Sequence, residues 1–127
     1  MSRHFDFIET PIVGLLRIDR KLITDNRGFF SRFFCADEFK QIELEQPIAQ
    51  MNHTLTRQKG SIRGMHFHYQ PHAETKIVSC IHGEVLDVAV DIRKNSPTFL
   101  NSSQAAAHFC GDSGAVVFSG ASSFSGA

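Results

Sequence analysis

The stretch that decides the fold of this 127-residue chain is Lys76-Ile77-Val78-Ser79-Cys80-Ile81-His82-Gly83-Glu84-Val85-Leu86-Asp87-Val88-Ala89-Val90-Asp91-Ile92. Two runs rich in valine, isoleucine and leucine, 76–81 and 84–92, flank the dipeptide His82-Gly83. Such residues favour strands, and a two-residue link that contains glycine is typical of a β-hairpin. The stretch therefore predicts two paired antiparallel strands.

Side chains alternate between the two faces of a strand, so Lys76 shares a face with Val78 and lies at the rim of the core if Val78 is buried. A lysine there needs anions or water, which makes it a candidate site residue; a strand-end lysine that reaches solvent is the plainer interpretation. In the second run Asp87 and Asp91 share a face with apolar neighbours. We expect Asp91 to pair with Arg93, whereas Asp87 is either an ion-pair residue or part of a site wall.

The upstream sequence is also mostly β, and apolar or alternating patterns predict strands at residues 13–18, 21–23, 29–34, 49–54 and 61–67. The stretch Asp25-Asn26-Arg27-Gly28 predicts a turn, because Asn and Gly tolerate positive φ. Residues 36–41 predict one helical turn with Asp37 as its cap and Phe39 buried. Many short strands with glycine-bearing turns favour an all-β sandwich or jelly roll.

Composition excludes several classes of protein. Basic and acidic residues number 13 each, so no net charge points to a nucleic acid or a membrane surface. The chain has no long apolar run, and its N-terminus lacks a signal-peptide pattern. Cys35, Cys80 and Cys110 are odd in number and irregularly spaced, which fits a reduced protein better than a disulfide scaffold. We predict a cytoplasmic protein that binds neither nucleic acid nor membrane.

The composition changes after Leu100. Residues 1–100 hold all the charged side chains except Asp112, whereas residues 101–127 are mostly serine, alanine and glycine. Such a change is typical of a linker or tail. We therefore predict a jelly-roll domain over residues 1–100 and a low-complexity tail over residues 101–127, in which 116–118 is the one segment suited to a strand.

A histidine lies close to Lys76 in the sequence, on the predicted strand 61–67. Strict alternation puts Arg63 and His66 on opposite faces, so a site that uses both requires the strand to bend, and Gly64 is where a bulge would do that. A histidine and a lysine that share a cavity can remove a carbon-bound proton beside a carbonyl and hold the resulting enolate. That chemistry needs no cofactor.

A metal site is the alternative interpretation of the same region. His66-x-His68 followed by Glu74 approximates a cupin metal motif that binds Fe, Mn or Zn. The gaps after His68 and Glu74 are looser than that motif prefers, and only His108 offers a later histidine ligand. We expect no metal and no cofactor, and we keep a metal-dependent cupin as the alternative.

The order and spacing of several motifs resemble dTDP-4-dehydrorhamnose 3,5-epimerases over roughly residues 9–100. The matching stretches are 25–30, Gln50-x-Asn52, 59–67, 71–76, 83–93 and 96–99. The resemblance implies a cupin-type jelly roll that forms a homodimer and acts on a dTDP-linked 4-keto sugar. Its implied reaction is epimerisation at C3, C5 or both, by proton abstraction and reprotonation.

The resemblance also implies roles for individual residues. His66 would be the base, Lys76 would stabilise the negative oxygen at C4, and Asp87 would orient one of these two groups. A forked guanidinium fits phosphate oxygens, so Arg63 would contact the diphosphate. The implied substrate-binding residues are Arg27, Gln50, Asn52 and Arg63, with Arg27 reaching the nucleotide or phosphate, also from a partner subunit.

The chain departs from that family at three places. Arg32 stands where the family has a glutamate, and His68 stands where it usually has a glutamine. The family's second half, with the tyrosine that reprotonates the sugar, has no counterpart here, and Tyr69 lies in a different motif. We therefore expect a jelly roll that is incomplete at its C-terminus, a tail that is not family sequence, and weak or absent epimerase activity. A non-catalytic sugar-nucleotide binder is the third interpretation.

Overall fold

The structure is a computed structural model that describes the backbone of residues 3–69, 72–108, 114–119 and 122–126 and the side chains as far as Gln104. It consists of strands with one short helix, α1 (Ala36–Phe39), which continues into a 3-10 turn, η1 (Lys40–Ile42). The strands are β1 (Phe5–Glu9), β2 (Leu16–Arg20), β3 (Ile23–Asp25), β4 (Gly28–Phe30), β5 (Ile62–His66), β6 (Thr75–Val78), β7 (Glu84–Val90), β8 (Ser102–His108), β9 (Gly114–Ser119) and β10 (Ser122–Gly126).

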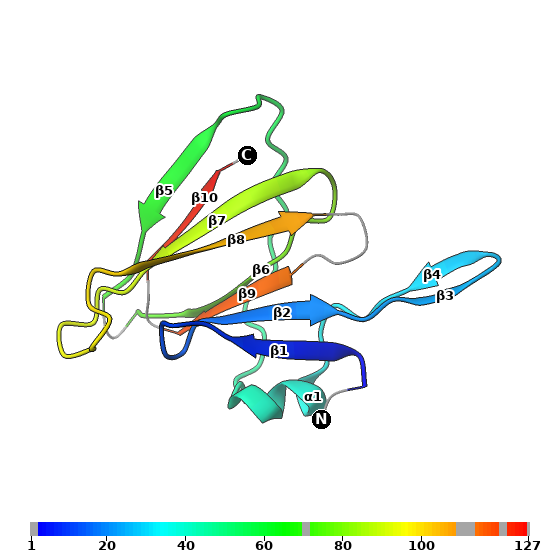
Figure 1. Ribbon diagram of the computed structural model, residues 1–127, viewed down its shortest axis with the longest axis horizontal. Coiled ribbons are helices and arrows are strands. Elements are labelled where there is room, and N and C mark those ends of the chain that lie inside the picture. Colours follow the sequence, from blue (N-terminus) through cyan, green and yellow to red (C-terminus); the bar gives the residue numbers. More distant parts are fainter. Residues whose placement is uncertain (1–2, 70–71, 109–113, 120–121, 127) are drawn as a thin grey trace.

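Two four-stranded antiparallel sheets make up the body of the molecule (Figure 1). The first sheet has the order β1-β2-β9-β6 and the second the order β5-β10-β7-β8. Val78 of the first sheet packs in one cluster with Ala89 of the second, so these two faces look toward each other. The predicted all-β jelly-roll class is confirmed.

The outer face of the first sheet is covered by α1. Phe5, Ile18 and Phe39 form its buried cluster, in which the rings of Phe5 and Phe39 lie 5.0 Å apart at 77°. Burial of each such side chain contributes about 1.5–3 kcal/mol, which fixes the short helix on the sheet. The predicted burial of Phe39 is confirmed, but the predicted cap is wrong. The N-cap position is Cys35, and Asp37 lies within the first turn.

The predicted hairpin of the strands at 76–81 and 84–92 is wrong, because β6 and β7 belong to different sheets. β6 pairs with β9, whereas β7 pairs with β8 and β10. Residues 79–83 carry the chain from one sheet to the other, and Gly83 has a φ of 78°. The crossing lets Val78 pack from the opposite sheet against the cluster that contains Ala89.

Most upstream strands differ from the predictions in length, and β1 was not predicted. The turn at Asp25 is confirmed, since Asp25 pairs with Gly28 between β3 and β4. The predicted strand at 49–54 is irregular, and Met51 is 82% exposed. No strand among the described residues pairs with this segment, so its backbone N–H and C=O groups make no β-ladder hydrogen bonds there.

The stretch predicted as a tail forms three strands. β9, which contains the segment 116–118, lies between β2 and β6 in the first sheet, and β10 lies between β5 and β7 in the second (Figure 1). Both sheets are therefore continuous only through this stretch. Its origin outside the family sequence stays a prediction, and Cys110 lies outside the described residues.

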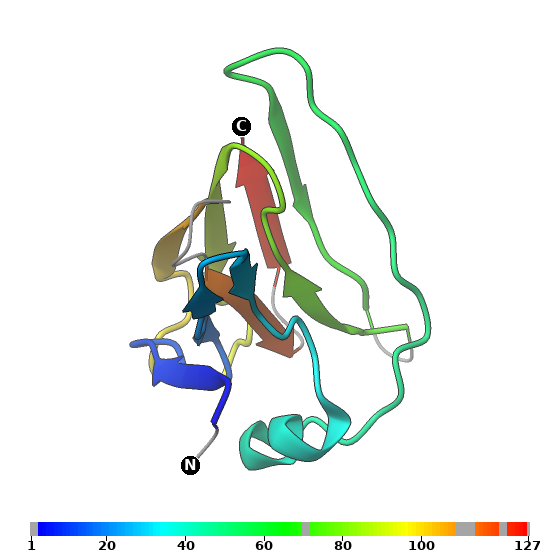
Figure 2. The ribbon, with the colours of Figure 1, turned by 90° about the vertical axis from the view of Figure 1, so that its right-hand side faces the viewer.

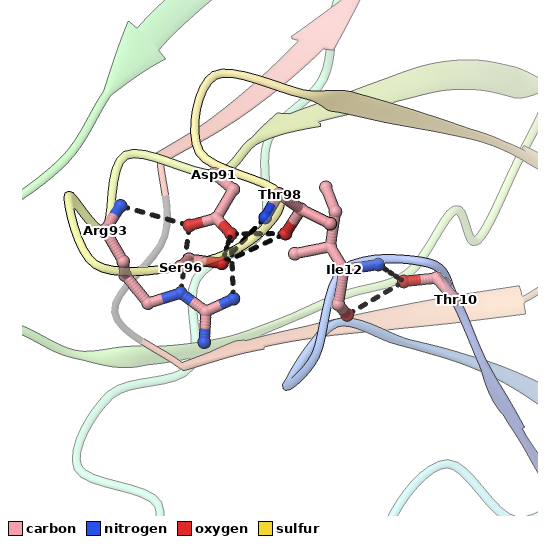
Figure 3. Close-up of polar contacts among 6 residues, drawn as sticks. All are labelled: Thr10, Ile12, Asp91, Arg93, Ser96 and Thr98. Carbon is pink, nitrogen blue, oxygen red and sulfur yellow. Dashed lines mark hydrogen bonds and ion pairs between the residues drawn. The ribbon is translucent and has the colours of Figure 1, made fainter.

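The turn after β7 is built around Asp91, which is fully buried (Figure 3). Its carboxylate accepts hydrogen bonds from the Arg93 backbone N–H (3.0 Å) and Nε (2.9 Å), Ser96 Oγ (2.5 Å) and Thr98 Oγ1 (2.7 Å). The Arg93 guanidinium, and then the two hydroxyls, hold the pKa of Asp91 well below its usual range. The predicted Asp91–Arg93 pair is confirmed, and it fixes the loop from β7 to β8.

Candidate functional site

A bulge in β5 brings Arg63 and His66 onto one face. In the pairing of β5 with β10, His66 is opposite Ser123 and Arg63 is opposite Ser125, so the register shifts between the two pairs. Gly64 lies within the shift and has a φ of 119°, which favours glycine. The bend predicted at Gly64 is confirmed.

β10 also pairs with β7 on its other side, so the faces of β5 and β7 can be compared through β10. Ser123 also pairs with Ala89, and Ser125 also pairs with Asp87. Residues directly opposite in a ladder share a face, so Arg63 and His66 lie on the same face as Asp87, two strands and about 10 Å away. Figure 2 shows β5, β10 and β7 side by side. This face looks toward the first sheet.

Lys76 approaches from that first sheet. It shares a face of β6 with Val78, which packs against the cluster that contains Ala89, so Lys76 also belongs to the space between the sheets. Its side chain is 34% exposed, and its Nζ lies 3.3 Å from Oε1 of Glu74. The lysine therefore lies at the mouth of this space, where its charge is partly hydrated and directly paired.

Asp87 lies deeper and is only 3% exposed. Neither carboxylate oxygen accepts a hydrogen bond of standard length and angle from a described residue, although the Val88 backbone N–H is close enough to act on it. Burial raises the pKa of Asp87 to about 6, although the Val88 amide and the positive charge of Lys76 both lower it. Lys76 and Asp87, on opposite sheets, thus interact electrostatically. The structure places Asp87 in the wall of the space rather than in an ion pair.

Replacing Asp87 by asparagine is expected to raise the free energy of unfolding by about 3 kcal/mol at pH 7.5 and to leave it nearly unchanged at pH 4. The folded carboxyl keeps its proton to about pH 6, whereas the unfolded one loses it near pH 4. The unfolded state therefore holds fewer protons in this window, and stability falls as pH rises from about 4 to 6. Urea denaturation across that range measures the difference.

The matched control for this prediction is Asp6→Asn, because the Asp6 side chain is 58% exposed. Its effect should stay within about 0.5 kcal/mol at every pH. An Asp87→Asn effect that does not depend on pH would show that the buried carboxyl does not titrate as its burial indicates.

The four remaining predicted binding residues lie in different places. Arg63 belongs to the face just described. Arg27 is at the tip of the β3–β4 hairpin, 86% exposed and 2.6 Å from Asp25, and Gln50 and Asn52 are exposed in the irregular segment before β5. No described contact joins these three to His66 or Lys76. One chain therefore places the predicted catalytic residues on two facing sheets, whereas Arg27, Gln50 and Asn52 lie apart from them.

The metal alternative depends on His66, His68 and Glu74. The Glu74 carboxylate lies 3.6 Å from Nδ1 of His68 but is also paired with the ammonium of Lys76. Within the described part of the chain, no three His, Cys, Asp or Glu side chains stand close enough to hold a metal ion. The side chain of His108, on β8, lies outside that part.

Two features near the site were not predicted. Glu74, predicted above only as a ligand in the metal alternative, pairs with Lys76, and Arg17 lies 3.0 Å from Asp19 while it lines, with Asp87, a cavity of about 160 Å³ between the sheets. Both pairs are oppositely charged residues two apart in sequence, and that spacing puts them on one face of a strand. This signal was available in the sequence.

Arg32, one of the departures, lies outside the site. Its Nη1 is 3.0 Å from Oε2 of Glu38 on α1 and 3.1 Å from Nδ1 of His4. The guanidinium therefore ties the helix to the N-terminal segment.

Comparisons with known proteins converge on one family. Residues 9–108 match the dTDP-4-dehydrorhamnose 3,5-epimerase family. The chain is 43% identical over 93 residues to dTDP-4-dehydrorhamnose 3,5-epimerase of Shigella flexneri, covering 72% of this chain and 51% of that protein. It is 39% identical over 95 residues to the protein of that name from Methanothermobacter thermautotrophicus, covering 75% and 50%. The chain thus spans about half the length of these curated relatives.

Solved structures match over more of the chain. dTDP-4-dehydrorhamnose 3,5-epimerase from Sulfolobus tokodaii superposes with a TM-score of 0.86 at 33% identity, covering 97% of this chain and 68% of that one. A dTDP-6-deoxy-D-glucose-3,5-epimerase from Legionella pneumophila, in complex with dTDP-4-keto-L-rhamnose, gives 0.88 at 33% identity, with 97% and 65% covered. With 97% of this chain covered, both matches extend beyond residue 100.

Proposed function

The chain belongs to the dTDP-4-dehydrorhamnose 3,5-epimerase family, and we propose that it removes and returns the hydrogen at C3, C5 or both of a dTDP-linked 4-keto sugar. The observation that carries the proposal is the facing arrangement of the two sheets. His66 and Arg63 lie on the inner face of one, and Lys76 lies on the inner face of the other. A relative of similar fold is solved with dTDP-4-keto-L-rhamnose.

The chemistry follows from the carbonyl group at C4. This ketone acidifies the hydrogens on C3 and C5, and a neutral imidazole of His66 is a base suited to remove one near pH 7. The negative charge then moves to the C4 oxygen, where the ammonium of Lys76 stabilises it. Asp87 acts on Lys76 through its charge from the opposite sheet. No step requires a cofactor.

Substrate binding uses the remaining predicted residues. Arg63 shares the inner face with His66 and offers a planar fork of donors to the diphosphate. Gln50, Asn52 and Arg27 contact the nucleotide. Since Arg27 stands at the tip of an exposed hairpin, we propose that it does so from a partner subunit.

A deuterium wash-in experiment tests this function. Incubation of the full chain with a dTDP-4-keto-6-deoxy sugar in D₂O should introduce deuterium at C3 or C5, read by mass spectrometry and NMR. Exchange without inversion indicates a working base without a donor on the opposite face. Binding of dTDP by calorimetry without any exchange would instead support the non-catalytic binder, and exchange that needs an added metal would support the metal-dependent cupin.

We also propose a homodimer, formed through the β3–β4 hairpin. The hairpin projects from the body of the molecule (Figure 1), and Ile23, Phe29 and Phe30 on it are 50%, 57% and 55% exposed. Clustered apolar side chains of this kind are typical of protein interfaces. Phe29→Ser with Phe30→Ser should shift the sedimentation coefficient from dimer to monomer. Val13→Ser, at a site 74% exposed, should not, and a wild-type monomer would refute the proposal.

A cytoplasmic location belongs to the same proposal. Cys35 and Cys80 are both free thiols, which suits a reducing compartment. No helix among the described residues is long and apolar enough to cross a membrane. Recovery of the protein in a membrane or secreted fraction on cell fractionation would contradict this location.

A further inference from the structure

Glu74 is the direct ionic partner of Lys76. It immediately precedes β6, and its Oε1 lies 3.3 Å from Nζ of Lys76. The same oxygen lies 3.6 Å from Nδ1 of His68, so the carboxylate is held between two nitrogen groups. Its side chain is 49% exposed, which places the pair at the mouth of the space between the sheets.

A second carboxylate lies deeper and is left without a partner. Asp87 is 3% exposed, and both of its oxygens lack a hydrogen bond within the described part of the chain. A buried carboxylate in this state is strongly destabilising, and an ammonium nearby would form an ion pair with it if nothing held the ammonium back. Lys76 is close enough to act on Asp87 through its charge, yet it pairs with Glu74 instead.

We propose that Glu74 is a positioning residue, whose carboxylate holds the Lys76 ammonium at the mouth of the inter-sheet space and away from the buried Asp87. The proposal rests on the function proposed above, since Lys76 is the group that meets the C4 oxygen. An ammonium paired with the buried Asp87 is withdrawn from the substrate. An ammonium in the half-exposed pair with Glu74 readily leaves that carboxylate for the stronger negative charge that develops on the C4 oxygen.

Other charged groups face Asp87 and must be held constant in a test. Arg17 and Asp19 come from β2, Arg63 and His66 share its face from β5, and Glu9 lines the cavity beside it. All five remain in every variant compared below, so their effects on Asp87 cancel. The only changes are at positions 74, 76 and 87.

The test follows the pH dependence of stability, which needs no substrate. The free energy of unfolding in urea is measured from pH 4 to 8 for the full chain and for its Asp87→Asn variant. The difference between the two, plotted against pH, isolates the titration of Asp87. When Glu74→Gln is added, the released Lys76 should pair with Asp87 and lower the midpoint of that titration by about one pH unit or more. In a Lys76→Met background Glu74→Gln should shift it by less than about 0.3 unit.

Two outcomes overturn the proposal. One is an unchanged midpoint in Glu74→Gln, and the other is an equal shift with and without Lys76, which would mean that Glu74 acts on Asp87 directly. Glu45→Gln makes the same charge change at an exposed position and serves as the control. In the wash-in experiment Glu74→Gln should slow exchange about 2- to 5-fold. If wild type shows no exchange, the proposed function fails while the denaturation experiment still decides the role of Glu74.

Discussion

Replacing Asp91 by asparagine is expected to lower the free energy of unfolding by about 3–5 kcal/mol. The side chain is fully buried, and its two oxygens accept hydrogen bonds from Arg93, Ser96 and Thr98. An amide keeps the shape but carries no charge, and its NH₂ group turns a donor toward groups that also donate. Urea denaturation at pH 7 measures the loss.

The chain contains a matched control at Asp25. That carboxylate also accepts from a backbone N–H and a guanidinium two residues later, those of Arg27, but its side chain is 49% exposed. Because exposed ion pairs contribute little, Asp25→Asn should change the unfolding free energy far less than Asp91→Asn does. Equal losses for Asp25→Asn and Asp91→Asn would show that burial does not set how much the Asp91 carboxylate contributes to the free energy of unfolding.

The pH dependence gives the Asp91 prediction a second measurement. Its folded pKa lies below the unfolded value, so its contribution is complete above about pH 4 and is lost as the pH falls below that. Asp87 has the opposite sign over pH 4 to 6. Asp91→Asn should therefore weaken the acid-side loss of stability and leave the fall between pH 4 and 6 unchanged.

Features set by neighbours in the sequence could be predicted. The pair of Asp91 with Arg93, the bend at Gly64 and the burial of Phe39 each depend on spacing within a few residues. The period of two along a strand also gave the faces of Lys76 and Asp87. Of these features, the bend at Gly64 and the faces of Lys76 and Asp87 position the candidate catalytic residues.

Features set by distant partners could not be predicted. The sequence from 76 to 92 looks like a hairpin locally, but its two arms pair with distant strands, β6 with β9 and β7 with β8 and β10, and so lie in opposite sheets. After Leu100 only the segment 116–118, which lies in β9, was suited to a strand, and the serine- and alanine-rich composition did not predict β8, β10 or the central places of β9 and β10, because ladder hydrogen bonds come from the backbone. Likewise, the unpaired state of Asp87 depends on what surrounds it in three dimensions.

Replacing His66 by glutamine is expected to slow deuterium wash-in at C3 or C5 by about 10²- to 10⁴-fold, because the amide cannot take up the proton. Lys76→Met should slow it by about 10²- to 10³-fold, since the C4 oxygen then develops its charge without a cation. His66 is exposed and Lys76 partly so; stability should therefore change little and dTDP binding should persist in both variants. Single-turnover exchange at pH 7 with saturating sugar nucleotide measures both rates.

Control variants separate chemistry from binding in that experiment. His53→Gln and Lys59→Met make the same changes at exposed positions in the irregular segment before β5, and they should leave exchange within about 2-fold. If His66 and Lys76 act on the same proton transfer, the double variant His66→Gln with Lys76→Met should be no more than marginally slower than His66→Gln alone. The effects of residues that act as a unit are not additive. Fully multiplicative losses, or exchange that survives His66→Gln, would mean that the imidazole and the ammonium do not serve one reacting carbon.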